Sequence, residues 1–177
     1  EFHESGSVNA EPRHWERAAS MVREVDKMLS DRGLQGNLYN HVWFMVDTPQ
    51  AELRIIGEAG ATTIRPGIAA FHNHFHQGTP DVPELLDLPG MDRLGYLALL
   101  NAVPKPEPFR MVPIDAGVID MAALLGHVWK RGYTGPIVTQ AYDIGGDPYM
   151  TARRSINYIR EVWDRFERNP ALNPATG

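Results

Sequence analysis

The stretch that decides the fold runs from Val112 to Ile159 and reads VPIDAGVIDMAALLGHVWKRGYTGPIVTQAYDIGGDPYMTARRSINYI. Apolar side chains recur at three- and four-residue spacings over residues 120–131, which predicts an amphipathic helix, and Gly132 is a typical stop signal for it. Residues 137–140 form a run of strand length. Asp147-Pro148 then predicts the start of a second, longer helix. The stretch is therefore a helix–strand–helix unit.

The same alternation extends toward the N-terminus. We expect helices over residues 12–33, 49–59 and 82–88, and strands over residues 37–43, 67–72 and 94–100. The strands are apolar almost throughout, which is typical of parallel strands that helices cover. Four strand–helix units of about 30 residues each make half of a closed eight-unit barrel, which usually needs about 250 residues. The predicted fold class is α/β, with a (βα)4 half-barrel.

The half-barrel is predicted to occupy residues 12–168. We expect residues 1–11 to be a tail or tag remnant and residues 169–177 to be a C-terminal tail. Four parallel strands alone would leave two open sheet edges, and closure of a barrel removes such edges. A partner is therefore expected: a homodimer, a separate subunit that carries a complementary half-barrel, or a missing N-terminal segment.

Composition excludes several classes of function. The formal net charge is −5, and no run of Lys and Arg exceeds two residues, so the electrostatic attraction that drives nucleic-acid binding is missing. The chain has no cysteine, which excludes disulfides, thiolate nucleophiles and cysteine-ligated zinc. No apolar run approaches the ~20 residues that span a bilayer, so no membrane partner is expected. A small, neutral or mildly polar ligand fits this chain best.

Polar side chains gather where the predicted strands end, which is where barrels of this kind carry their reactive groups. His72, His74 and His76 alternate, so they would share one face if the strand continued, and three imidazoles can ligate one metal. The alternative is that some of them only bond to loop carbonyls. The predicted substrate-binding residues are Tyr39, Asn40, Trp43, Asn73, Asn101, Asp115 and Gln140, because amides and aromatic rings suit a hydroxyl-rich ligand such as a sugar. Asp120 fits a helix N-cap better than a site residue.

Three motifs resemble the sugar phosphate isomerase/epimerase group of the xylose isomerase-like TIM barrels. They are the opening stretch with its phrase GYTGPIV, LYNHVW at Leu38–Trp43, and FHNHFHQG at Phe71–Gly78. The resemblance covers residues 15–166 and corresponds to the C-terminal half of that barrel. It implies proton transfer on a sugar with the help of a divalent metal (Mn, Mg, Zn or Co), held by a Glu, Asp, His, Glu set of ligands.

At all four positions that correspond to the metal ligands of that group, this sequence has a different residue. The first Glu falls on Tyr39, the Asp on Asn73, the His near Asn101 and the last Glu on Gln140, whereas two further histidines of the group match His41 and His76. The exchange removes about three negative charges that would hold a cation. A site without a metal is therefore as compatible with the residues as one with a metal.

Two functions remain open. The first is an isomerase or epimerase of a sugar or polyol, in which His41, His74 or His76 moves the proton, because imidazole titrates in the useful range. The second is a carbohydrate-binding or structural half-barrel subunit without catalysis. A phosphodiesterase on the same fold would need a carboxylate-rich zinc cluster and a basic groove, and the sequence offers neither.

Overall fold

The structure is a computed structural model that describes residues 6–77, 82–103 and 110–174. The elements are η2 (Ser7–Asn9), α1 (Pro12–Ser30), β1 (Gly36–Asn37), α2 (Pro49–Ala59), β2 (Ile64–Arg65), β3 (Gly67–Ala69), α3 (Ala70–Gln77), α4 (Val82–Leu86), η3 (Met91–Arg93), β4 (Tyr96–Leu99), β5 (Asn101–Ala102), β6 (Met111–Val112), α5 (Met121–Lys130), β7 (Ile137–Thr139), α6 (Pro148–Arg168) and η4 (Pro170–Leu172).

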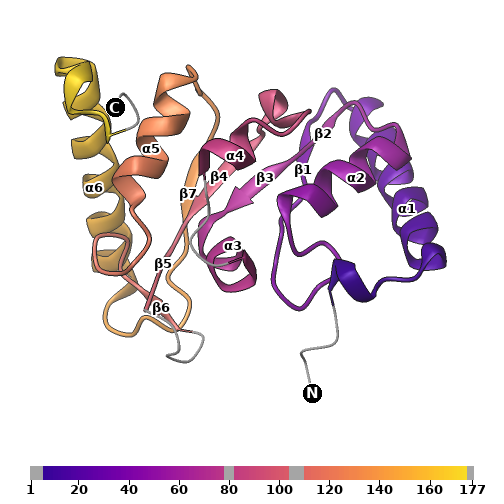
Figure 1. The fold of residues 1–177 in the computed structure, drawn as a ribbon, viewed down its shortest axis with the longest axis horizontal. Coiled ribbons are helices and arrows are strands. Elements are labelled where there is room, and N and C mark those ends of the chain that lie inside the picture. The colour runs from indigo at the N-terminus through magenta and orange to yellow at the C-terminus, as the bar shows by residue number, and fades with distance from the viewer. Residues whose placement is uncertain (1–5, 78–81, 104–109, 175–177) are drawn as a thin grey trace.

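The strands follow one another across the sheet in chain order. β1 pairs with β2, and β3, β4 and β7 form a second sheet in that order, all parallel. Only Pro66 separates β2 from β3, so the two sheets continue each other (Figure 1). A sequential order of parallel strands joined by helices is the topology of a barrel wall, which confirms the predicted α/β fold class.

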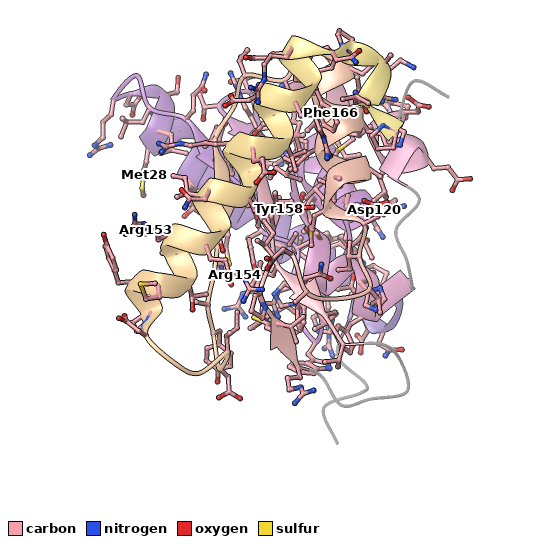
Figure 2. The ribbon with its side chains drawn as sticks, turned by 90° about the vertical axis from the view of Figure 1, so that its left-hand side faces the viewer. Met28, Asp120, Arg153, Arg154, Tyr158 and Phe166 are labelled. Atoms are coloured by element: carbon pink, nitrogen blue, oxygen red, sulfur yellow. The ribbon has the colours of Figure 1, made fainter. Side chains whose placement is uncertain are left out.

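Helices cover the sheet and bury the core against it. α1 packs on α2, and α5 packs on α6, at the two ends of the molecule in Figure 1. The main core joins β3 and β4 to α5 and α6, and its fully buried members include Ile68, Leu97, Leu124 and Phe166. Figure 2 looks onto α6, with Tyr158 turned toward the Asp120 end of α5 and Phe166 farther along the helix. No helix within the described ranges is long and apolar enough to span a bilayer.

The predicted helices are present, although α1 ends at Ser30 rather than Gly33 and α4 ends at Leu86 rather than Leu88. The boundaries that agree are those fixed by local signals. Thr48 caps α2 by accepting the Ala51 N–H at 3.1 Å, and Asp120 caps α5 by accepting the Ala123 N–H at 2.9 Å. Gly132 follows α5 with φ 68°, the left-handed conformation expected there.

Asp26 ties α1 to the loop before β2. Its carboxylate accepts the backbone N–H groups of Thr62, Thr63 and Ile64 at 2.7–3.1 Å, and the Thr63 hydroxyl at 2.6 Å. Burial raises the pKa of Asp26, but these hydrogen bonds outweigh burial and lower the pKa to about 2.

One prediction about the second unit is wrong. Residues 70–77 form helix α3, so the strand stops at Ala69 and the three alternating histidines do not share a strand face. No β-branched residue follows Ile68 in this segment, and Phe71 and Phe75 lie four residues apart with ring centroids at 4.8 Å, a contact that a helix allows and a strand does not.

Candidate functional site

A cleft of 320 Å³ opens at the carboxyl ends of the strands, the end that carries the chemistry in barrel proteins. It is lined by Tyr39, His41, Trp43, His72, Met111, Gln140 and Tyr142. A larger cavity of 870 Å³ lies near Arg65 and Tyr133, at the opposite ends of the strands. We take the smaller cleft as the candidate site because it brings together the residues that follow the strands.

The cleft joins the two outermost strands of the described sheet. Tyr39 and His41 follow β1, while Gln140 and Tyr142 follow β7, and β3 and β4 lie between them. Burial raises the pKa of Tyr39, and Gln140 beside it opposes that rise. The sheet must therefore curve strongly, as a barrel wall does, for its first and last strands to share one cleft.

Two histidines stack inside the cleft. The ring centroids of His41 and His72 are 3.8 Å apart, with an angle of 34° between the ring planes. Nδ1 of His41 lies 2.6 Å from the carbonyl oxygen of Val42. Because a carbonyl oxygen only accepts, Nδ1 carries the proton and Nε2 carries the lone pair. His41 therefore presents a basic nitrogen.

His72 is held neutral by its surroundings. It is 1% exposed, and burial lowers its pKa to about 3, with a further contribution from the charge on His41. The edge of its ring meets Tyr39 at 5.5 Å, and Tyr39 in turn stacks on Tyr96 at 5.9 Å. At neutral pH His72 is therefore the uncharged member of the stacked pair.

Backbone strain is concentrated at the cleft. Among the described residues, the non-glycine residues with positive φ are Trp43 at 71° and Asp143 at 54°. Trp43 lines the cleft, and Asp143 directly follows the lining residue Tyr142. A left-handed conformation costs a non-glycine residue about 1–2 kcal/mol, and such costs gather at functional sites. The indole of Trp43 is 39% exposed and available to a ligand.

Helix α3 distributes its other polar residues away from the cleft. His76 Nε2 lies 2.9 Å from Oδ2 of Asp47, a buried carboxylate that also accepts the Ser7 N–H at 3.0 Å. His74 is 4% exposed and Asn73 is fully buried, and neither belongs to the cleft lining. Of the three alternating histidines, only His72 faces the site.

The predicted metal site at His72, His74 and His76 is wrong. On a helix, residues two apart point in opposite directions, so the three imidazoles cannot converge on one ion. Within the described ranges, no group of three His, Cys, Asp or Glu side chains is placed to hold a metal. The cleft itself offers two imidazoles, two phenols and an amide, whereas hard divalent cations prefer carboxylate oxygens. This set of donors does not fit a hard divalent cation such as Mg²⁺.

Three residues that were predicted to contact a ligand bond to other parts of the chain instead. Asn40 Oδ1 accepts the Ala69 N–H at 3.0 Å. The Asn101 amide donates to the carbonyls of Ile114 and Ile119 at 2.9 and 3.0 Å, and its oxygen accepts the N–H groups of Ile119 and Ala102, both at 2.9 Å. Asp115 pairs with Arg154 on α6 at 2.8 Å. These side chains hold loops around the cleft.

Sequence reasoning missed three residues at or beside the site. Met111 enters the cleft from the hairpin of β5 and β6, which no sequence signal predicted. Glu52 is fully buried beside the first strand, although its place in the first turn of α2 is typical of an exposed helix residue. Tyr142 was visible beyond the fourth strand, but its position gave no reason to choose it.

Solved structures with the same fold include sugar epimerases. L-ribulose 3-epimerase is 16% identical with a TM-score of 0.72, over 94% of this chain and 59% of that one. D-allulose 3-epimerase from Methylomonas sp. is 14% identical with a TM-score of 0.70, over 86% and 57%. A xylose isomerase-like TIM barrel protein from Mycobacterium smegmatis, in complex with magnesium, is 18% identical with a TM-score of 0.71, over 88% and 52%.

This chain therefore spans a little over half the length of those structures. A search of curated proteins found no match. A sequence model of one family matches residues 2–162, which is most of the chain. The chain belongs to the xylose isomerase-like TIM barrel family.

Proposed function

We propose that the cleft binds a sugar or polyol and that the chain is a sugar isomerase/epimerase-like protein that works by proton transfer. The observation that carries this proposal is the stacked pair of His41 and His72, which presents one basic imidazole nitrogen in a cleft at the carboxyl ends of the strands. Structures of similar fold include epimerases of L-ribulose and D-allulose, which supports a keto-sugar as the ligand.

The lining suits an uncharged, hydroxyl-rich ligand. Tyr39, Gln140 and Tyr142 offer hydroxyl and amide groups that both donate and accept, and no Lys, Arg, Asp or Glu is among the lining residues. Trp43 adds an aromatic surface on which the C–H face of a sugar can lie. Binding would rest on hydrogen bonds and ring contacts.

Isomerisation and epimerisation remove a proton from a carbon beside a carbonyl group and return it to a carbon. His41 Nε2 has the lone pair to accept that proton and, once protonated, can give it back. Burial raises the pKa of Tyr39, so its phenol stays protonated and can donate to the oxygen that becomes negative. We assign His74 and His76 no step, because both lie outside the cleft lining.

A second candidate function is sugar binding without turnover. It is favoured by the absence of any carboxylate from the cleft lining, because metal-assisted sugar isomerisation relies on such groups. The same Tyr, Gln and Trp side chains would then bind hydroxyl groups without chemistry.

We also propose that further strands complete the barrel, supplied by a second copy or by a complementary half-barrel. Within the described part, β1 and β7 each have only one strand neighbour. Exposed apolar side chains lie on the helix that precedes β1 and on the helix that follows β7: Met21, Val25 and Met28 on α1, and Tyr149, Met150 and Ile156 on α6. Native mass spectrometry checks this, because a strictly monomeric chain at all concentrations would exclude self-association.

The decisive experiment is solvent exchange. The chain is incubated in deuterium oxide with a panel of keto-sugars that includes ribulose and allulose, and deuterium at carbon is measured by NMR. Exchange that is lost in His41→Gln and kept in His14→Gln, an exposed histidine on α1, is the expected result. Binding without exchange for any sugar would leave the non-catalytic function, and no binding to any of them would refute both.

A further inference from the structure

The ladder between the first two strands stops abruptly beside the cleft. The Gly36 N–H donates to the Thr63 carbonyl at 3.1 Å, and the Leu38 N–H donates to the Arg65 carbonyl at 3.0 Å. In the same parallel register, the next bridge would join Tyr39 to Gly67. In that bridge, the Gly67 N–H would donate to the carbonyl of Leu38, and the Asn40 N–H would donate to the carbonyl of Gly67.

A side chain occupies the place of that bridge. Oε2 of Glu52 accepts the Gly67 N–H at 2.7 Å, and the backbone N–H of Asn40 also donates to the Glu52 carboxyl. These are the two donors of the missing bridge. One step farther, the Ala69 N–H bonds to the side-chain oxygen of Asn40 rather than continuing the strand ladder.

We propose that Glu52 is the positioning residue of the cleft: its carboxyl group separates the first strand from β3 and turns Tyr39 and His41 out of the sheet into the site. The role of the cleft as a ligand site rests on the proposed function, but the placement of these side chains does not. Without the carboxyl group, the two strands would close into a continued ladder and carry Tyr39 and His41 with them.

The surroundings are built for this insertion. Glu52 is 0% exposed, and a buried carboxyl persists only where donors meet it. Burial raises its pKa well above the usual range, against the opposing effect of the Gly67 and Asn40 N–H groups. On the far side of Gly67, a Cβ atom would lie 2.1 Å from Cε1 of Tyr96, so only glycine admits the Tyr96 ring on which Tyr39 stacks.

The first test needs no mutation. In isotope-labelled wild-type protein, NMR should detect a coupling across the hydrogen bond, between the amide nitrogen of Gly67 and the side-chain carboxyl carbon of Glu52. A coupling from Gly67 to the backbone carbonyl of Leu38 instead would overturn the proposal, because the ladder would then be continuous.

The second test uses variants of one helix. Glu52→Gln keeps the shape but replaces one acceptor oxygen by a donor, and Glu52→Asp shortens the side chain. Glu58→Gln is the matched control, because Glu58 lies on the same helix at the surface, paired with Arg54 at 2.7 Å. We expect Glu52→Asp to shift the ring resonances of His41 and His72 and to weaken binding of the keto-sugar at least about fivefold. Glu52→Gln can keep an acceptor at the Oε2 position, so its effect should be smaller.

The outcomes separate the two proposals. If the wild-type chain binds no sugar, the proposed function fails, while the histidine resonances still decide the role of Glu52. If a folded Glu52→Asp variant leaves those resonances where Glu58→Gln leaves them, Glu52 does not position the site. If both variants unfold, the wild-type coupling alone decides.

Discussion

Replacing Asn101 by alanine tests whether its side-chain amide holds the backbone in place or contacts a ligand. Its side chain makes four hydrogen bonds to the backbone, and three of them hold the loop of residues 114–119 beside the end of β4. Each such bond contributes a net of about 1 kcal/mol, and the four share one amide, so Asn101→Ala should lower the free energy of unfolding by about 3 kcal/mol. Gly117 is part of the same contact, because a Cβ there would lie 2.3 Å from the Asn101 oxygen.

The assay is urea unfolding followed by tryptophan fluorescence, with the dissociation constant of a keto-sugar measured at low urea. Asn101→Asp keeps the two acceptor contacts but sets a buried carboxylate oxygen against the carbonyl oxygens of Ile114 and Ile119, so it should cost at least as much as Asn101→Ala. Asn157→Ala, at an exposed position of α6, is the control and should change stability by no more than about 0.5 kcal/mol.

The result that would refute this reasoning is a loss of sugar affinity with stability unchanged. That combination would show that the amide contacts the ligand and that the backbone bonds contribute little. Loss of stability with affinity retained in the folded fraction is what the structure predicts.

Four shorter predictions follow from single features. Because hydrogen bonds lower the pKa of Asp26 from 3.8 to about 2, its stabilisation should be complete above pH 3.8 and vanish as the pH falls toward 2, and Asp26→Asn should remove this part of the pH dependence of urea unfolding. Because burial lowers the pKa of His72 from 6.5 to about 3, stability should fall below pH 6.5 by up to about 1.4 kcal/mol per pH unit, and His72→Gln should flatten that slope. Trp43→Gly relieves a φ of 71° but removes a partly buried indole that contacts His41, so stability should change little, while sugar binding measured by titration calorimetry should weaken; an unchanged affinity would remove Trp43 from the site. Gly67→Ala places a Cβ against Tyr96 and should cost about 1–3 kcal/mol in the same unfolding assay, with part of the loss recovered when Tyr96→Ala is added.

The sequence predicts the helices well because each carries its own boundary signal. Thr48 and Asp120 cap α2 and α5, and Gly132 ends α5, all through contacts within a few residues. The parallel order of the strands also follows from the alternation of apolar strands and helices. The strands themselves are shorter than predicted: β1 ends at Asn37 because the Glu52 side chain takes over its ladder, which no local pattern reveals.

The site is predictable only in part, for the same reason. Tyr39, His41, Trp43 and Gln140 follow strands and do line the cleft. Whether an amide faces a ligand or a loop carbonyl depends on distant backbone, and Asn101 is the example, since its partners lie up to 18 residues away. The histidine pattern failed because a period of two was assumed for a segment that is helical.

The sheet curves strongly enough for its first and last described strands to share one cleft. The width of that cleft therefore depends on side chains within the sheet as well as on the lining residues. Ala69 and Ala98 are opposite each other on β3 and β4, both fully buried on the face that Tyr96 shares. A bulkier side chain at either position would crowd the facing residues of β3 and β4 and strain the sheet between Tyr39 and Gln140. Side chains within the sheet, away from the cleft lining, can thus influence how wide the cleft is.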